Sequence, residues 1–340
     1  CSSDLNLNNG LIGYEPLDSG SGTGSTGTGT GSTGTGTTTP PSTATGGGSS
    51  SVVQPVPVVL ADGQINVQNH LNNDAGRITA NGGIDLTASN GLENHATLSL
   101  NKLTVTGDRL DNSSGTITSA QLTANTISMN NTAGKLGASG DVALTSNNLT
   151  NSAGQITAGG TLNAQIAGVV LNDNGTIAAD NSLALNAGAL NNTHGTVASV
   201  NADATVNSNN ALNNASGSIQ SASALNVTAN GIDNTDGTVV GGAVNVNSNG
   251  QSLNNTRGQV SGNALTVNSG VLNNDAGILQ GNTRLDLNTH SQTLTNSNSG
   301  SSSGITSGGA LTIQSGDLNN STGYIGSTGA AVIQSAQVTN

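Results

Sequence analysis

The sequence has 340 residues and a formal net charge of −12, with two Tyr and neither Phe nor Trp. Hydrophobic residues make up 32% of it, and nearly all of them are Ala, Val, Leu or Ile. Large aromatics supply much of the buried area of a compact domain, so this composition argues against one and favours a repeat array with a thin aliphatic core. The six Lys and Arg residues are scattered, so we expect no nucleic-acid partner.

Residues 1–18 contain Cys1, the single cysteine of the sequence. Because the sequence starts with Cys rather than Met, we interpret this segment as the lipidated N-terminus of a mature bacterial lipoprotein, with Cys1 as the lipid attachment site. Each buried CH₂ of an acyl chain contributes about 0.8 kcal/mol, so several chains would hold the protein at a membrane. Ser2 and Ser3 favour the outer membrane of a Gram-negative bacterium, by analogy with lipoproteins of that type. The alternatives are an arbitrary boundary at a cysteine and a reactive thiol.

Residues 19–51 consist almost entirely of Gly, Ser and Thr, which predicts a flexible linker. Residues 52–70 are expected to form a capping coil. All five prolines lie at or before Pro57. Since proline removes a ladder hydrogen bond and is excluded from central strands, the proline-free chain that follows is compatible with continuous β-structure.

Residues 71–340 repeat a unit that begins L-x-N-x-x-G-x-I and continues with L-x-L about six residues later. Successive motif glycines from Gly115 to Gly277 are 19 to 22 residues apart, and the paired aliphatic residues are two apart, as on one face of a strand. The copy at Leu92 lacks the glycine, and the copy at Leu294 carries an insertion. We therefore predict an all-β fold, a right-handed parallel β-helix of about thirteen coils with a repeat of about 20 residues.

The asparagine two residues after the first leucine points to the same side of the strand as that leucine. Stacked amides at this position can hydrogen-bond from coil to coil, which predicts a structural asparagine ladder. The glycine three residues later is expected to adopt a positive φ at the corner. The predicted ladder consists of Asn73, Asn112, Asn131, Asn151, Asn172, Asn192, Asn214, Asn234, Asn255, Asn274 and Asn320.

The segments LNNDAGRI, LDNSSGTI, LTNSAGQI, LNNASGSI and LNNSTGYI resemble the repeats of filamentous haemagglutinins and related large exoproteins, including the stalks of contact-dependent inhibition toxins. The resemblance covers about residues 71–340. It implies a β-helical stalk at the cell surface, used in adhesion or in presenting other domains.

Some parallel β-helices are carbohydrate-active enzymes, which need aligned carboxylates and a basic partner. The best acidic group consists of Glu93, Asp108 and Asp111 near Arg109, a weak candidate for a calcium site because calcium requires six or more oxygen ligands. A solvated surface patch is the simpler interpretation. The four histidines, His70, His95, His194 and His290, are far apart in the sequence and predict no metal-ligand set. Apart from covalent lipid, no cofactor is expected.

These features favour a non-enzymatic, surface-anchored structural lipoprotein. We expect two partners, the outer membrane through the lipid and further copies of the chain through the ends or edges of the β-helix, which would build a surface layer or filament. The segment Leu5–Ile12 resembles a stray piece of the repeat and could add a strand to an adjacent subunit. An adhesin that binds host or glycan surfaces is the alternative, and a carbohydrate-active enzyme is the least favoured class.

Overall fold

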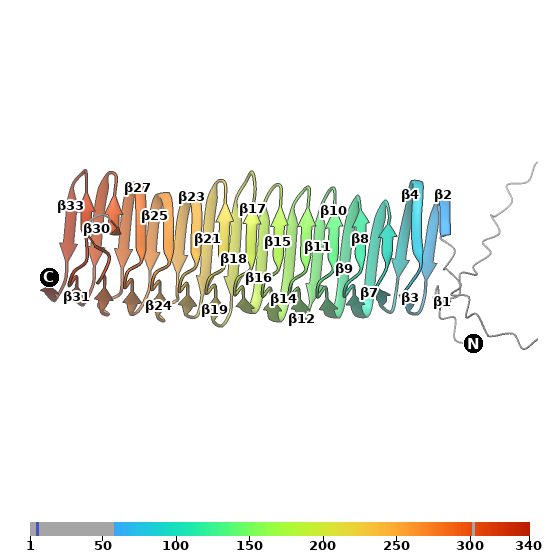
Figure 1. Ribbon diagram of the computed structural model, residues 1–340, viewed down its shortest axis with the longest axis horizontal. Coiled ribbons are helices and arrows are strands. Elements are labelled where there is room, and N and C mark those ends of the chain that lie inside the picture. The colour runs from blue at the N-terminus through green and yellow to red at the C-terminus, as the bar shows by residue number, and fades with distance from the viewer. Residues whose placement is uncertain (1–4, 7–57, 301–302) are drawn as a thin grey trace, which may run out of the picture.

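The repeats form a parallel β-solenoid of about 14 turns, an elongated rod in Figure 1. The computed structural model describes residues 5–6, 58–300 and 303–340, so Cys1 and the segment 19–51 lie outside the described residues. Within the described chain every regular element is a strand. No helix in these ranges is long and apolar enough to cross a lipid bilayer.

Each coil contains three strand positions, and some strands extend over two of them. The L-x-N position is formed by β1 (Leu5–Asn6), β3 (Leu71–Asn73), β5 (Leu92–Asn94), β12 (Asn148–Thr150), β19 (Leu212–Asn213), β22 (Ile232–Asp233), β24 (Leu253–Asn254), β26 (Leu272–Asn273), β28 (Leu294–Thr295), β31 (Asp317–Asn319) and β34 (Gln337–Thr339). The G-x-I position is formed by β6 (Thr97–Ser99), β8 (Thr116–Ser119), β10 (Lys135–Ala138), β13 (Gln155–Ala158), β15 (Thr176–Ala179), β17 (Thr196–Ser199), β20 (Ser218–Ser221), β29 (Gly304–Ser307) and β32 (Ile325–Ser327).

The L-x-L position is formed by β11 (Val142–Ser146), β18 (Ala204–Ser208), β21 (Ala224–Ala229), β30 (Ala310–Gln314) and β33 (Ala331–Gln334). Longer strands cover this position and a neighbouring one: β2 (Val58–Val67), β4 (Arg77–Ala88), β7 (Lys102–Asp111), β9 (Gln121–Asn130), β14 (Leu162–Leu171), β16 (Leu183–Asn191), β23 (Thr238–Asn247), β25 (Gln259–Asn268) and β27 (Ile278–Asn288).

Side chains alternate between the inside and the outside of the coil, as the period of two in the sequence requires. In β9, Leu122, Ala124 and Met129 are buried while their neighbours are exposed or half-buried. Equivalent aliphatic residues lie in register on successive coils; Leu122, Val142 and Leu162 are one such set. Burying each of these Val or Leu side chains stabilises the rod by about 1.5–3 kcal/mol.

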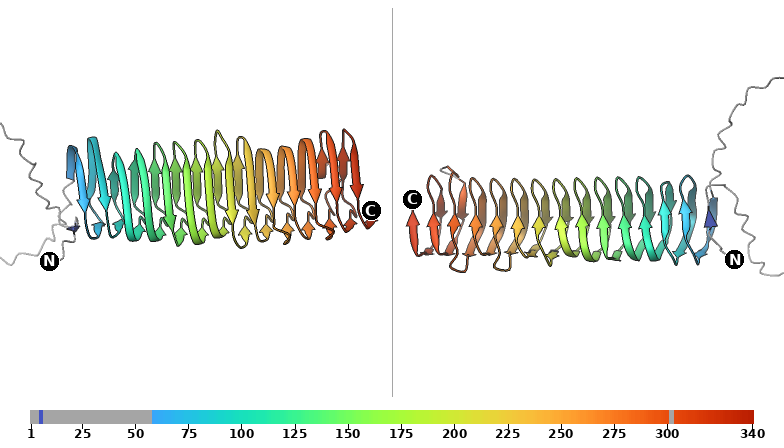
Figure 2. Two further views of the ribbon diagram at one scale, coloured as in Figure 1. Left: turned by 180° about the vertical axis from the view of Figure 1, so that it is seen from behind. Right: turned by 90° about the horizontal axis from the view of Figure 1, so that it is seen from below.

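The coils stack in a single row along the rod, with the N-terminal and C-terminal coils at opposite ends (Figure 2). The predicted fold class is therefore confirmed, with about 14 turns instead of about thirteen. The additional turn arises because Val338 continues the leucine column by pairing with Leu318.

At the N-terminal end, β2 lies over β4, and β1 pairs in parallel with β3, so that Leu5 is opposite Leu71. The sequence suggested instead that Leu5–Ile12 adds a strand to a second subunit. In the structure its first two residues pair within their own chain, where the covalent connection keeps their effective concentration high. Residues 7–12 lie outside the described residues.

Candidate functional site

A column of buried asparagines follows one corner of the solenoid from end to end. In each coil the side-chain Nδ2 donates a hydrogen bond of 2.6–2.8 Å to the Oδ1 of the asparagine in the next coil towards the C-terminus. Nδ2 also reaches backbone oxygens of the turn; that of Asn151 lies 3.0 Å from the oxygen of Thr176. The column thus satisfies polar groups that would otherwise be buried without partners.

The structure places all eleven predicted asparagines in this column and adds three more, Asn94, Asn296 and Asn340. Asn94 belongs to the copy at Leu92, which lacks the motif glycine, and Asn296 to the copy at Leu294, which carries an insertion. Their L-x-N triplets were nevertheless intact, so this shorter pattern was the signal that identifies them.

The prediction that the motif glycine takes a positive φ is wrong. The residue before the glycine does so instead; Ser216 has φ 54° and Ala153 has φ 53°. The glycine is required for space: a Cβ on Gly217 would overlap the backbone oxygen of Asn192 and lie 2.6 Å from Oδ1 of Asn214. The close approach of the asparagine column to the turn therefore selects glycine at this position.

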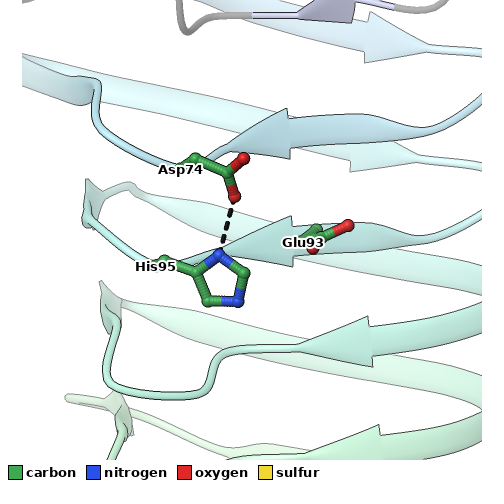
Figure 3. Close-up of side chains that lie close together, drawn as sticks. All are labelled: Asp74, Glu93 and His95. Carbon is green, nitrogen blue, oxygen red and sulfur yellow. Dashed lines mark hydrogen bonds and ion pairs between the residues drawn. The ribbon is translucent and has the colours of Figure 1, made fainter.

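The first coils bring together a group of ionisable side chains, shown in Figure 3. One ligand atom each from Asp74, Glu93 and His95 lies within 4.8 Å of the others. Nδ1 of His95 is 2.7 Å from Oδ1 of Asp74, and Nε2 is 3.9 Å from Oδ1 of Asp111. These four side chains are only 20–36% exposed. His95 therefore lies between carboxylates from the coils on either side.

Glu93 is held by two further contacts. It accepts a hydrogen bond from the guanidinium of Arg109, and its Oε2 lies 3.4 Å from Nε2 of His70. The sequence predicts that the four histidines lie far apart, but stacking of the coils brings His70 and His95 to the same cluster of carboxylates. His194 and His290 lie at corners of other coils.

The structure brings together only part of the calcium candidate. Glu93 and Asp111 are register partners on adjacent coils, whereas Asp108 is exposed. Asp111 accepts hydrogen bonds from Ser113 and Asn130. Among the residues that the structure describes, the close ligand set contains Asp74 and His95 in place of Asp108 and Asp111. Sequence reasoning missed these two, although each directly follows a ladder asparagine.

A shallow groove of about 520 Å³ crosses several coils away from the asparagine column, directly after the buried aliphatic pair of the L-x-L position. Asn125, Thr145, Gln165 and Asn186 line it and are register partners on four successive coils. Ile127, which is 58% exposed, adds an apolar contact surface. No residue that lines the groove is charged.

Comparison with protein families decides the assignment. Six overlapping segments, 59–128, 101–167, 158–214, 197–259, 239–299 and 278–340, match the haemagglutinin repeat. The chain belongs to the haemagglutinin-repeat family. This is a structural, adhesin-type β-helix family whose repeats typically occur in secreted or cell-surface bacterial proteins. No curated protein and no solved structure matches this haemagglutinin-repeat chain.

Proposed function

We propose that this haemagglutinin-repeat protein is a non-enzymatic structural component of the cell surface, a stiff rod that carries an assembling or adhesive surface. The observation that carries the proposal is the uninterrupted asparagine column beside a continuous aliphatic core. The column runs from Asn73 to Asn340 and the buried core from Val67 to Leu318, so that neighbouring coils are joined by side-chain hydrogen bonds as well as by the backbone. Such an array supports length and stiffness.

Labelling of intact cells tests the location. Antibodies raised against the full chain should label unpermeabilised cells, and electron microscopy of the purified protein should show rods roughly 60 Å long, from coils about 4.8 Å apart. Labelling that requires permeabilisation would contradict a surface role. The proposal includes acylation of Cys1 and attachment to the outer membrane, which mass spectrometry of membrane-extracted protein tests directly.

For this surface role, we favour self-association of the protein through the ends of its rods. Ile333 and Val338 continue the buried columns of Ile313 and Leu318 but are 44% and 57% exposed on the coil that contains β33 and β34. At the other end, Oδ1 of the buried Asn73 has no hydrogen-bond partner within the described chain. An apolar end face and an unpaired acceptor would both be satisfied by another coil of the same type.

Analytical ultracentrifugation of the delipidated chain provides the test. Replacing Ile333 and Val338 by Lys should abolish concentration-dependent assembly, while replacing Val200, which is 55% exposed on the side of the rod, by Lys should leave it unchanged. If the wild-type chain remained monomeric at high concentration, self-assembly would be contradicted and adhesion would be the remaining proposal.

Adhesion is the second candidate, and the neutral groove favours it. Amide and hydroxyl groups repeat along the groove at the spacing of the coils, and the lining lacks charge, so a neutral oligosaccharide fits its chemistry better than a sulfated one. On a glycan array that carries neutral and sulfated oligosaccharides, Gln165→Ala should weaken binding, whereas Gln220→Ala, which lies outside the groove, should not. Retention of only sulfated glycans would contradict this assignment.

A further inference from the structure

The geometry points to a binding site for a divalent transition-metal ion at Asp74, Glu93 and His95, with zinc as the ion that suits the ligand set best. An ion that holds its ligands at about 2 Å in a tetrahedron separates them by roughly 3.3 Å. The three ligand atoms already lie within 4.8 Å of one another, and the pair from Asp74 and His95 is 2.7 Å apart. Small rotations of half-exposed side chains would complete the site.

The ligand types select the class of ion. Calcium and magnesium require oxygen ligands, whereas one imidazole nitrogen with two carboxylates suits zinc and its neighbours. Three protein ligands leave a fourth tetrahedral position for water. The local charge agrees, because Asp74, Glu93 and Asp111 contribute three carboxylates and Arg109, which contacts Glu93, contributes one permanent positive charge.

The surrounding residues resemble the outer support that metal ligands require. With Nδ1 of His95 directed at the ion, Nε2 faces Asp111, so the second ring nitrogen has a carboxylate to which it can donate. The Arg109 guanidinium and His70 contact Glu93 and fix its orientation. His95 and Glu93 therefore each have a partner that orients them without the ion.

The backbone beneath the site is rigid. The ladder bond from Asn73 to Asn94 measures 2.6 Å, and these residues directly precede Asp74 and His95. The amide of His95 also donates to the backbone oxygen of Asn73. Because the coils are tied together at this point, little conformational entropy is lost when the ligands gather round an ion.

The same corner differs in other coils. There the residue after the ladder asparagine is often Ser or Thr, whose hydroxyl donates to the side chain two residues before it, as Thr193 does to Asn191 and Thr235 to Asp233. Those contacts remain within one coil. In contrast, Asp74 and His95 contact each other between coils, so a bound ion would connect the first coil to the second.

Titration with zinc chloride tests the site on the full-length chain, with Cys1→Ser in every variant so that the thiol cannot bind the metal. Calorimetry of metal-free protein should give one zinc ion per chain, and zinc should raise the midpoint of thermal unfolding. His95→Gln and Asp74→Asn should each weaken binding at least about tenfold. His194→Gln, at an exposed corner of a different coil, is the matched control and should bind like the parent.

Circular dichroism should show that all the variants remain folded without metal, since the aliphatic core is unchanged. Zinc binding of equal strength in the His95→Gln and His194→Gln proteins would overturn the site, as would no binding by the parent chain. Calcium chloride in place of zinc should give neither heat nor a shift in the unfolding midpoint; an equal response to both ions would contradict the assignment to a transition metal.

Discussion

Asparagine and glycine, the two residues that recur at this corner, have different structural roles. Asparagine is buried and supplies hydrogen bonds between coils, whereas glycine leaves room for those bonds. The residue directly before the glycine, such as Ser216, adopts the left-handed conformation. The corner thus combines a strained backbone, a small residue and a paired amide at three neighbouring positions.

Replacing Gly217 by Ala should destabilise the rod by about 1–3 kcal/mol, because the new Cβ would overlap the backbone of Asn192. Chemical unfolding followed by circular dichroism measures the change. Gly63→Ala is the control, since no atom lies within 4 Å of a Cβ at that position. Equal stability of the two variants would show that space does not select glycine here.

Replacing Asn214 by Leu should cost about 1–3 kcal/mol, because its neighbours Asn192 and Asn234 each lose a partner in a buried column. Asn163→Ala, at an exposed position on a strand, should change the unfolding free energy little. If Asn214→Leu were neutral, hydrophobic packing rather than hydrogen bonding would be the main contribution of the column.

Residue patterns in the sequence predict some of these features better than others. The L-x-N triplet identifies positions on the inner face because side chains in a strand alternate with a strict period of two. The same pattern cannot show which turn residue is left-handed, since Ser216, Ala153 and His194 share no side-chain property that marks it. The pairing of Asp74 with His95 was also hidden, because it depends on stacking of residues 21 positions apart.

At the scale of the corner element, side chains of neighbouring turns form ion pairs along the outside of the rod. Arg257 donates two hydrogen bonds to Asp236, and both residues have φ 54° at the same place in successive coils. The hydrogen bond from Arg257, together with its charge, lowers the pKa of the Asp236 carboxyl below its usual 3.8. Both groups are exposed, so this pair contributes little to stability.

The sign of the pH dependence follows from that shift. A carboxyl whose pKa is lower in the folded state favours folding above its usual pKa, and the contribution is lost as the pH falls below 3.8 through the lowered value. An NMR titration of the Asp236 carboxyl should therefore give a midpoint under 3.8 in the wild type. Arg257→Gln should move the midpoint upwards; no movement would exclude Arg257 as the cause.

Calcium should leave the unfolding temperature of metal-free protein unchanged. Glu93 is already engaged by Arg109 and His70, and Asp111 by Ser113 and Asn130, so these carboxylates do not offer the many free oxygens that calcium requires. Differential scanning calorimetry with and without calcium chloride provides the measurement. A rise that disappears in Asp111→Asn would restore the calcium site predicted from the sequence.

At the scale of the molecule, each coil contacts only its neighbours, so whole coils should be removable units. Deleting residues 149–169 brings Val170 into the place of Leu149 and Asn172 into the column after Asn131. This variant should fold with the same β-sheet spectrum and only a modestly lower melting temperature.

Deleting residues 149–168 instead is the matched control. The remaining chain is one residue out of step, which turns buried side chains outwards and should prevent folding of the adjacent coils. If both deletions behaved alike, the coils would not be independent units.

The repeat length could be predicted from the sequence because the same aliphatic pair recurs in every coil. The pairing of Leu5–Asn6 with the first full coil could not be predicted, because a single short segment shows no periodicity.

The asparagine column has one further property, its direction. Every side-chain amide in it points its nitrogen towards the C-terminal end and its oxygen towards the N-terminal end. Backbone hydrogen bonds between coils run both ways; the amide of Asn131 donates towards the C-terminal end and that of Gln155 towards the N-terminal end, so their contributions largely cancel. Amide dipoles of about 3.5 D that align head to tail add along the axis. The asparagine column is therefore an axial electric dipole, with its negative pole at the coil that contains Asn73.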